Sequence, residues 1–228
     1  MPSSTPAVRD VIAWLKKPGS PKAAARLARY GFLTTTAYGI SVATLRAYAK
    51  RVSTDHELAM MLWKSGSLDA PILASFLAAP TQLTLAQMNA WCRDFDNWAI
   101  CDTVCFALFD RSPLAWGRLV PWSRARGEFQ KRAAFALLAS LALHDRKTDD
   151  AAFERQLPLI RAAADDERNF VKKGVLWALR GVGTRNPSLH RQALALAHEL
   201  ASSDAPSARW IGREAVRELK KRPPKKAR

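Results

Sequence analysis

The stretch NFVKKGVLWALRGVG, residues 169–183, decides the fold class. Its apolar residues recur every three or four positions, which is the spacing of one helix face: Val171, Val175, Ala178 and Val182. Lys173, Trp177 and Arg180 follow the same period on a different face. Because tryptophan is costly to expose without a partner, an indole between two cations indicates contact with a ligand. The stretch therefore predicts a packed helix with a second face available for binding.

Helical periodicity extends over most of the chain, and alternating β-branched runs are missing. Breaks rich in glycine and proline divide the sequence into about a dozen short helices. Paired in order, these form about six antiparallel helix pairs of about 38 residues each, close to the length of a HEAT-type repeat. We therefore expect an all-α chain folded as a short HEAT-like α-solenoid with a concave basic face. A compact helical bundle is the alternative, although it normally has fewer and longer helices.

Capping residues predict three helix starts. Ser53 or Thr54 precedes the run HELAMMLW, and Asp96 precedes the run NWAICDTVCFAL. Ser112 is followed by a proline, which is favoured at the first position of a helix.

The charge balance narrows the choice of partner. The 228 residues include 36 Lys and Arg against 20 Asp and Glu, which gives a net charge of +16. Such an excess favours a polyanionic partner, and an acidic membrane surface is the competing choice. No stretch approaches the roughly 20 consecutive apolar residues of a membrane-spanning helix, and the N-terminus lacks the pattern of a secretory signal. We expect a cytoplasmic protein, and nothing in the sequence requires a dimer.

Neither disulfides nor a metal site are expected. Cys92, Cys101 and Cys105 form an odd set, which argues against a disulfide framework and favours reduced packing residues. The four histidines are scattered, and none stands at ligand spacing from the cysteines. The sequence therefore predicts no metal and no cofactor.

The domain organisation follows from composition. Residues 1–219 are predicted to form a single domain, followed by a basic tail at 220–228. The tail, KKRPPKKAR, has two prolines and no apolar anchor, so we expect it to be disordered. Two roles remain open for it, namely non-specific phosphate contact or simple solubilisation.

The segment DFDNWAICDTVC, residues 94–105, carries the most informative carboxylate. If its helix starts near Asn97, then Trp98, Asp102 and Cys105 share one face. The apolar residues lie elsewhere: Ile100, Val104 and Leu108. Two interpretations stay open, a functional carboxylate beside an aromatic ring or a partly buried tryptophan beside an ordinary surface carboxylate.

A helix beginning at Glu128 carries a candidate cation, Arg132. Ala133, Leu137 and Leu141 are expected to pack inward, which places Arg132 off the main core stripe. In a chain this basic, Arg132 is by itself also consistent with one more phosphate contact.

These segments, together with RLARYGFLTTTAYGISVATLRAYAK near the N-terminus, resemble the bacterial AlkD-like family of DNA alkylation-repair glycosylases, which are built from HEAT-like repeats. The resemblance runs from about residue 26 to residue 217, and its motifs occur in the family's order. They are a tyrosine in an A-R-Y context ahead of a G-[IV] step, a Trp and an Asp four positions apart, an arginine in an R-R-x-A helix, and a tryptophan in K-x-x-x-W-x-L-R. The matching residues are Tyr30, Trp98, Asp102, Arg132 and Trp177.

The resemblance implies a glycosylase that releases positively charged N7- or N3-alkylated purines from duplex DNA. It assigns catalysis to Asp102, Trp98 and Trp177. It assigns DNA binding to a further set: Tyr30, Lys131, Arg132, Lys173 and Arg180. Asp102 would stabilise the positive charge that develops on the deoxyribose and orient the attacking water. The aromatic rings would face the cation, and Arg132 would hold the phosphate beside the lesion.

The sequence departs from the family's pattern at two positions. Ala99 follows Trp98 where many members carry Asp, and Lys131 stands first in the arginine pair. Neither position is one to which the family assigns chemistry. Two other functions remain open, a non-catalytic HEAT-like protein that binds damaged or branched DNA and a protein–protein scaffold.

Overall fold

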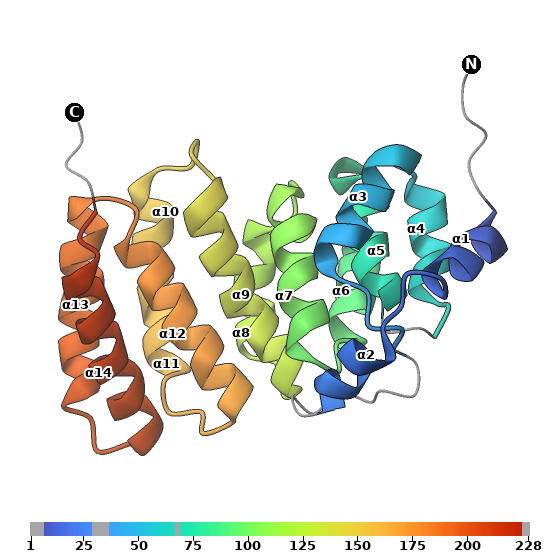
Figure 1. The fold of residues 1–228 in the computed structure, drawn as a ribbon. Coiled ribbons are helices and arrows are strands. Elements are labelled where there is room, and N and C mark those ends of the chain that lie inside the picture. The colour runs from blue at the N-terminus through green and yellow to red at the C-terminus, as the bar shows by residue number, and fades with distance from the viewer. Residues whose placement is uncertain (1–6, 29–36, 67–68, 225–228) are drawn as a thin grey trace. The chain divides into compact units, whose positions relative to one another are not determined.

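The computed structural model describes residues 7–28, 37–66 and 69–224. Every regular element in these ranges is a helix (Figure 1). The all-α prediction is therefore confirmed. The described residues contain α1 to α14, slightly more helices than the dozen or so expected from the breaks. The excess comes from short elements of five or six residues, which are too brief to produce a clear apolar period.

The chain divides into two compact units, one comprising residues 1–88 and 107–113 and the other residues 89–106 and 114–228. The single domain expected over 1–219 stays a prediction. The predicted tail boundary falls inside α14, which continues to Lys221.

In the first unit, α5 packs against α3 and α4, and α1 contacts α4 and α5. The unit contains α1 (Val8–Leu15), α2 (Pro21–Ala28), α3 (Val42–Val52), α4 (His56–Trp63), α5 (Asp69–Leu77), the 3-10 helices η2 (Pro80–Gln82) and η3 (Phe109–Arg111), and the start of α6 (Leu85–Arg93). The buried Asp69 carboxylate accepts the backbone N–H groups of Tyr38 (2.6 Å) and Ile40 (3.2 Å). These bonds fix the segment that leads into α3.

The second unit is built from successive helix pairs in two layers. Its elements are the end of α6, α7 (Trp98–Ala107) up to residue 106, η4 (Trp116–Arg118), α8 (Leu119–Ser123), α9 (Glu128–His144), α10 (Asp150–Glu154), α11 (Leu157–Ala162), α12 (Asn169–Gly183), α13 (Pro187–Ala201) and α14 (Pro206–Lys221). Within one layer α12 lies between α9 and α14, whereas α13 contacts α10 and α11 in the other. Consecutive helices close each pair: α8 with α9, α11 with α12 and α13 with α14 (Figure 1).

Several side-chain bonds between neighbouring helix pairs share one sequence separation. Three of them join residues 38 positions apart: Arg161 to Glu199, Gln192 to Glu154, and Arg180 to Glu218. The separation equals the repeat length of about 38 residues that the helix breaks predict. A strict sequence repeat is not needed for this regularity, because the pair length alone brings equivalent positions together.

Two of the three predicted helix starts are confirmed, at α4 and α7, but the predicted capping residues are wrong. α4 is capped by Asp55, whose carboxylate accepts the Leu58 N–H at 2.8 Å, while Ser53 ends α3 with φ at 71°. α7 is capped by Asn97, not Asp96. In each case the capping side chain stands three residues before the free N–H that it accepts. No α-helix begins directly after Ser112, because the next helical element is the 3-10 helix η4 at Trp116.

Candidate functional site

Helix α7 carries side chains that contact α9 and α12. Asn97 accepts the Ile100 N–H at 2.9 Å and so starts the helix at Trp98. Trp98, Asp102 and Phe106 then follow at intervals of four residues and share a face. Trp98 and Asp102 are partly exposed. The predicted common face of Trp98 and Asp102 is confirmed.

Two buried thiols join α7 to α9. The Cys101 thiol donates to the Phe129 carbonyl and the Cys105 thiol to the Ala133 carbonyl, each at 3.6 Å. All three cysteines are free and buried, so they pack as the sequence predicts. Because α7 and α9 are fixed in this register, their side chains meet at defined positions.

At the centre of this contact Asp102 and Arg132 form a bidentate ion pair. Arg132 Nε donates to Asp102 Oδ1 at 2.8 Å, and Nη2 donates to Oδ2 at 2.7 Å. Arg132 Nη1 donates to the backbone carbonyl of Phe170 on α12 at 2.7 Å. One guanidinium therefore connects three neighbouring helices and holds the carboxylate in a fixed orientation.

The expectation that Arg132 lies off the core is wrong, because the residue is only 6% exposed. All residues from Arg132 to Ala142 are buried, since α9 packs against α8 and α12 as well as α7. A helix covered on every side has no single core stripe, and its apolar period therefore does not mark which residues face solvent. The phosphate contact expected of Arg132 stays a prediction, and each of the three guanidinium nitrogens already donates one bond within the protein.

Burial and pairing act on the two charges in opposite directions. Burial raises the pKa of the Asp102 carboxyl, and the hydrogen bonds and charge of Arg132 offset part of this effect. Burial alone would lower the pKa of the Arg132 guanidinium, but Asp102 raises it. Of the two side chains, the carboxylate is the more accessible, at 17% exposed against 8% for the guanidinium. Both charges are therefore largely withdrawn from solvent.

Phe106 lies on the same face of α7 as Asp102 and forms an aromatic pair with Trp177 of α12. The rings of Phe106 and Trp177 are stacked, with centroids 4.6 Å apart and planes 8° from parallel. The two stripes predicted on α12 are confirmed: its valines and Ala178 are buried, whereas Lys173 is exposed and Trp177 and Arg180 are half-buried. Phe106 was not predicted from the sequence. Its position four residues after Asp102, in phase with Trp98, was the available signal.

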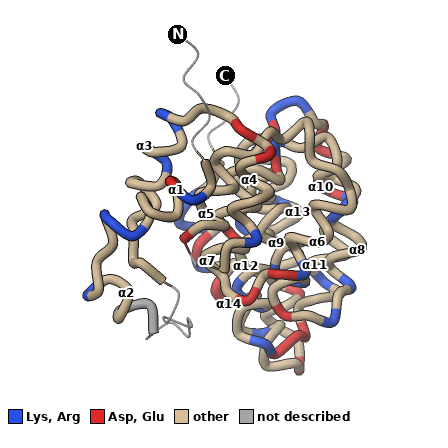
Figure 2. The backbone as a smooth tube through the Cα atoms, turned by 90° about the vertical axis from the view of Figure 1, so that its right-hand side faces the viewer, with Lys and Arg blue, Asp and Glu red and all other residues tan. Residues whose placement is uncertain are grey.

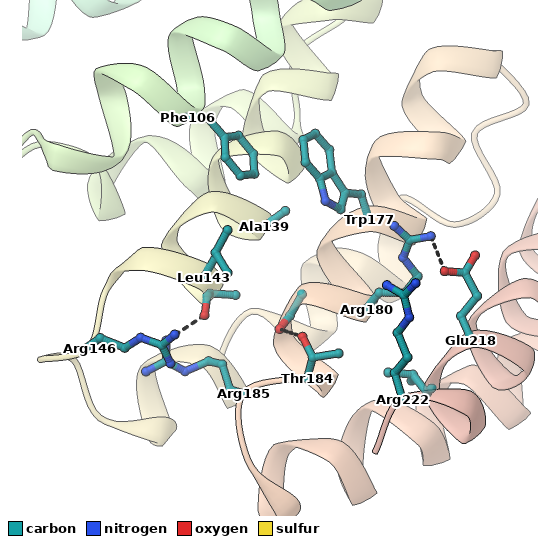
Figure 3. A pocket seen from close by; sticks show the side chains of 13 residues that line it. Phe106, Ala139, Leu143, Arg146, Trp177, Arg180, Thr184, Arg185, Glu218 and Arg222 are labelled. Carbon is teal, nitrogen blue, oxygen red and sulfur yellow. Dashed lines mark hydrogen bonds and ion pairs between the residues drawn. The ribbon is translucent and has the colours of Figure 1, made fainter. Parts of the chain in front are cut away.

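Beside this aromatic pair lies a cavity of about 270 Å³, which we call the arginine pocket (Figure 3). It is bounded by α9, α12 and α14, with Phe106 and Trp177 on one side. Its charged lining residues are Arg146, Arg180, Arg185, Glu218 and Arg222. Of these, only Arg180 was predicted from the sequence. Arg146, Arg185 and Arg222 lie just beyond helix ends, where no helical period identifies them, and Glu218 lies within α14.

The remaining predicted cations have different surroundings. Lys131 pairs with Asp166 at 3.0 Å, and Arg180 with Glu218 at 2.6 Å, while Lys173 is exposed. Tyr30 lies outside the described residues. Acidic residues lie among the basic ones along the second unit (Figure 2). The predicted concave basic face concerns the whole chain and stays a prediction.

In the described part of the chain, no group of three or more His, Cys, Asp or Glu side chains is arranged to hold a metal ion. No helix within those residues has the length and apolar character required to cross a membrane.

The family model described as "DNA alkylation repair enzyme" matches residues 11–219. The chain belongs to this family. A solved structure, described as a member of a new family of proteins related to the HEAT-like repeat DNA glycosylases with affinity for branched DNA structures, is similar in fold. The similarity has a TM-score of 0.78 and 18% identity over 97% of this chain and 98% of the other. The predicted HEAT-like fold is therefore confirmed. No curated protein matches the chain.

Proposed function

We propose that this DNA alkylation repair family member is a glycosylase that excises positively charged N7- or N3-alkylated purines from duplex DNA. The observation that carries the proposal is the Asp102 carboxylate, fixed by two bonds from Arg132 and more accessible than its partner. It lies on the same helix face as Trp98 and Phe106, and Phe106 stacks on Trp177. An oriented anion beside aromatic rings suits a reaction whose substrate and transition state are both cationic.

The proposed reaction requires stabilisation of charge on the sugar rather than on the leaving base. An N7- or N3-alkylated purine is cationic and leaves as a neutral base, so little acid catalysis is needed. As the N-glycosidic bond breaks, positive charge develops on the deoxyribose. The Asp102 carboxylate stabilises this charge and orients the water that attacks the sugar carbon. Each carboxylate oxygen accepts one bond from Arg132 and retains a lone pair for the sugar or the water.

The ion pair gives Arg132 a positioning role. A carboxylate held by a guanidinium does not reorganise when charge develops, which is the advantage of a preorganised site. Because both side chains are largely buried, the protein orients the carboxylate before DNA binds. Phosphate binding is a second role proposed for Arg132. Lys131, Lys173 and Arg180 are proposed to contact phosphates of the DNA backbone.

Trp98 and Trp177 are the aromatic contacts for the cation. A cation over an indole face gains about 0.5–2 kcal/mol. Phe106 stacks flat on Trp177 and so limits the orientations that this indole adopts. Tyr30, which lies outside the described residues, remains assigned to DNA binding.

The test is base release from methylated duplex DNA by wild type and Asp102→Asn. Loss of the charge is expected to lower the release of 7-methylguanine or 3-methyladenine by about 10²-fold or more, with affinity for unmodified duplex changed little. The exposed Asp165, changed to Asn, is the matched control and should release base like wild type. Thermal unfolding of both variants separates a loss of chemistry from a loss of structure. Equal release by wild type and Asp102→Asn removes Asp102 from the mechanism.

A second candidate is DNA binding without excision. It is favoured by the pairing of Asp102 with Arg132, since a neutralised carboxylate stabilises a nearby cation less than a free one. The structurally similar protein is itself described by its affinity for branched DNA. This candidate predicts salt-dependent DNA binding and no release of either methylated base by the wild-type protein.

A further inference from the structure

The arginine pocket carries charge that the ion pairs of the protein do not balance. Four arginines line it, whereas Glu218 is its one carboxylate among the described residues. Glu218 pairs with Arg180 at 2.6 Å, and Arg222 extends toward this pair (Figure 3). The pocket is therefore suited to an anion.

Arg146 and Arg185 reinforce this charge at the other end of the pocket. Arg185 is held in place by donating to the carbonyls of Ala142 (3.0 Å) and Asp145 (2.6 Å). Burial lowers the pKa of Arg185 and the charge of Arg146 lowers it further, whereas the carboxylates of Asp150 and Asp145 raise it, so Arg185 has both a like charge and opposite charges nearby. A bound anion would relieve the repulsion between the two arginines.

Helix ends explain part of this arrangement. Arg180 lies in the last turn of α12, and Arg222 follows the last residue of α14. Cations at helix C-termini are favourable without any ligand. That effect does not require the cations to surround one cavity or to have an aromatic pair at its side.

The aromatic side of the pocket narrows the choice of anion. Phe106 and Trp177 both line the cavity, and aromatic side chains of this kind stack on nucleic acid bases regardless of sequence. A base inside an intact duplex has both faces covered by its neighbours, so only an unpaired base is available. At about 270 Å³ the cavity is smaller than the usual 300–1,000 Å³ or so of a site that encloses a whole cofactor.

We propose that the arginine pocket binds an unpaired nucleotide of DNA, with the base against Trp177 and Phe106 and the adjoining phosphate between the arginines. This inference rests on the proposed function only in taking DNA as the partner. It adds a preference for DNA that contains an unpaired nucleotide, and it does not depend on base excision.

The experiment compares two DNAs of equal length, a fully paired duplex and the same duplex with one bulged nucleotide, at the same salt concentration. Wild type is expected to bind the bulged DNA about fivefold or more tightly, the lower limit for one stacked base. The double variant Arg146→Gln/Arg222→Gln should lose this preference. Arg191→Gln/Arg213→Gln removes the same charge from exposed positions outside the pocket lining and should keep it.

Equal affinity of wild type for the two DNAs overturns the assignment of the arginine pocket to an unpaired nucleotide. A preference for bulged DNA that survives in the pocket double variant overturns it as well. Trp177→Ala should also abolish the preference. Release of methylated bases is measured in parallel with the Arg146/Arg222 variant. A protein that prefers bulged DNA but releases no base refutes the proposed glycosylase and leaves the pocket assignment standing.

Discussion

The Asp102–Arg132 ion pair and the arginine pocket both involve α7, α9 and α12, yet they handle charge in opposite ways. At the ion pair, each donor group of a buried guanidinium has an acceptor within 2.8 Å. In the pocket, four arginines share one carboxylate. A buried charge must be matched because desolvation is costly, whereas a partly exposed charge keeps its water and needs no protein partner. The ion pair is therefore suited to precise chemistry, and the pocket is suited to attracting an anion.

The largest effect is expected from Arg132→Met, which leaves the Asp102 carboxylate buried without its partner. Removing one member of a buried pair costs about 3–5 kcal/mol. Urea unfolding at pH 7 measures the loss. Arg180→Met is the control, because it breaks the partly exposed pair with Glu218 and should cost about 1 kcal/mol or less. Equal losses would show that burial does not distinguish the two places.

The same variant has a defined pH dependence. Burial already raises the pKa of Asp102 above its value in the unfolded chain, and losing Arg132 raises it further. Below that raised pKa the folded variant binds a proton that the unfolded chain does not, so lowering the pH stabilises the fold. The stability deficit of Arg132→Met relative to wild type should therefore narrow between pH 7 and pH 5. A deficit that widens contradicts the assignment.

A smaller effect is expected at Asp145, in the loop that carries Arg146. Burial raises the pKa of Asp145, but hydrogen bonds from Thr148, Trp116 and Lys147 bring it down to about 2. Asp145→Asn should cost about 1–2 kcal/mol at neutral pH, as expected for lost charge-assisted bonds. Because the folded pKa is depressed, wild type loses this advantage as the pH falls toward 2. Thermal unfolding between pH 7 and pH 2 should show the two proteins converging.

Phe106→Leu tests the aromatic side of the pocket. The change keeps an apolar side chain but removes the stack on Trp177, which contributes about 0.5–1.5 kcal/mol. Unfolding free energy should fall by about that amount, and the near-ultraviolet circular dichroism of the tryptophans should weaken. An unchanged spectrum would mean that the stack does not order Trp177.

The smallest effect is expected from Lys173→Gln, which removes an exposed cation. If Lys173 contacts a phosphate, the slope of log affinity against log salt should flatten by about one unit. Lys131→Gln provides the comparison, because Lys131 already pairs with Asp166 and should change the slope less. Fluorescence anisotropy with unmodified duplex at several salt concentrations measures both.

The sequence predicted those parts of the structure that depend on local periodicity. The stripes of α12 and the shared face of Trp98 and Asp102 follow from helical spacing alone, and the structure has both. The pair length likewise predicted the 38-residue separation of the bonds between pairs.

What the sequence could not predict depends on packing between helices. The burial of Arg132 results from α9 being covered on all sides, a property of its neighbours that its own period does not contain. The same is true of the bond from Arg132 to Phe170, since a backbone carbonyl has no sequence signature. The arginine pocket combines residues from four helices and from the segments that follow three of them, so no single segment indicates it.

The bonds that join residues 38 positions apart also imply that helix pairs differ in their resistance to local unfolding. An interior pair is braced on two sides, but α14 belongs to the last pair of the described chain and is braced on one. Fraying of α14 would remove Glu218 and Arg222 from the arginine pocket while leaving Asp102 and Arg132 bonded. Amide hydrogen exchange should accordingly be faster in α14 than in α9. The α14 side of the arginine pocket would then open locally while the Asp102–Arg132 pair stays rigid.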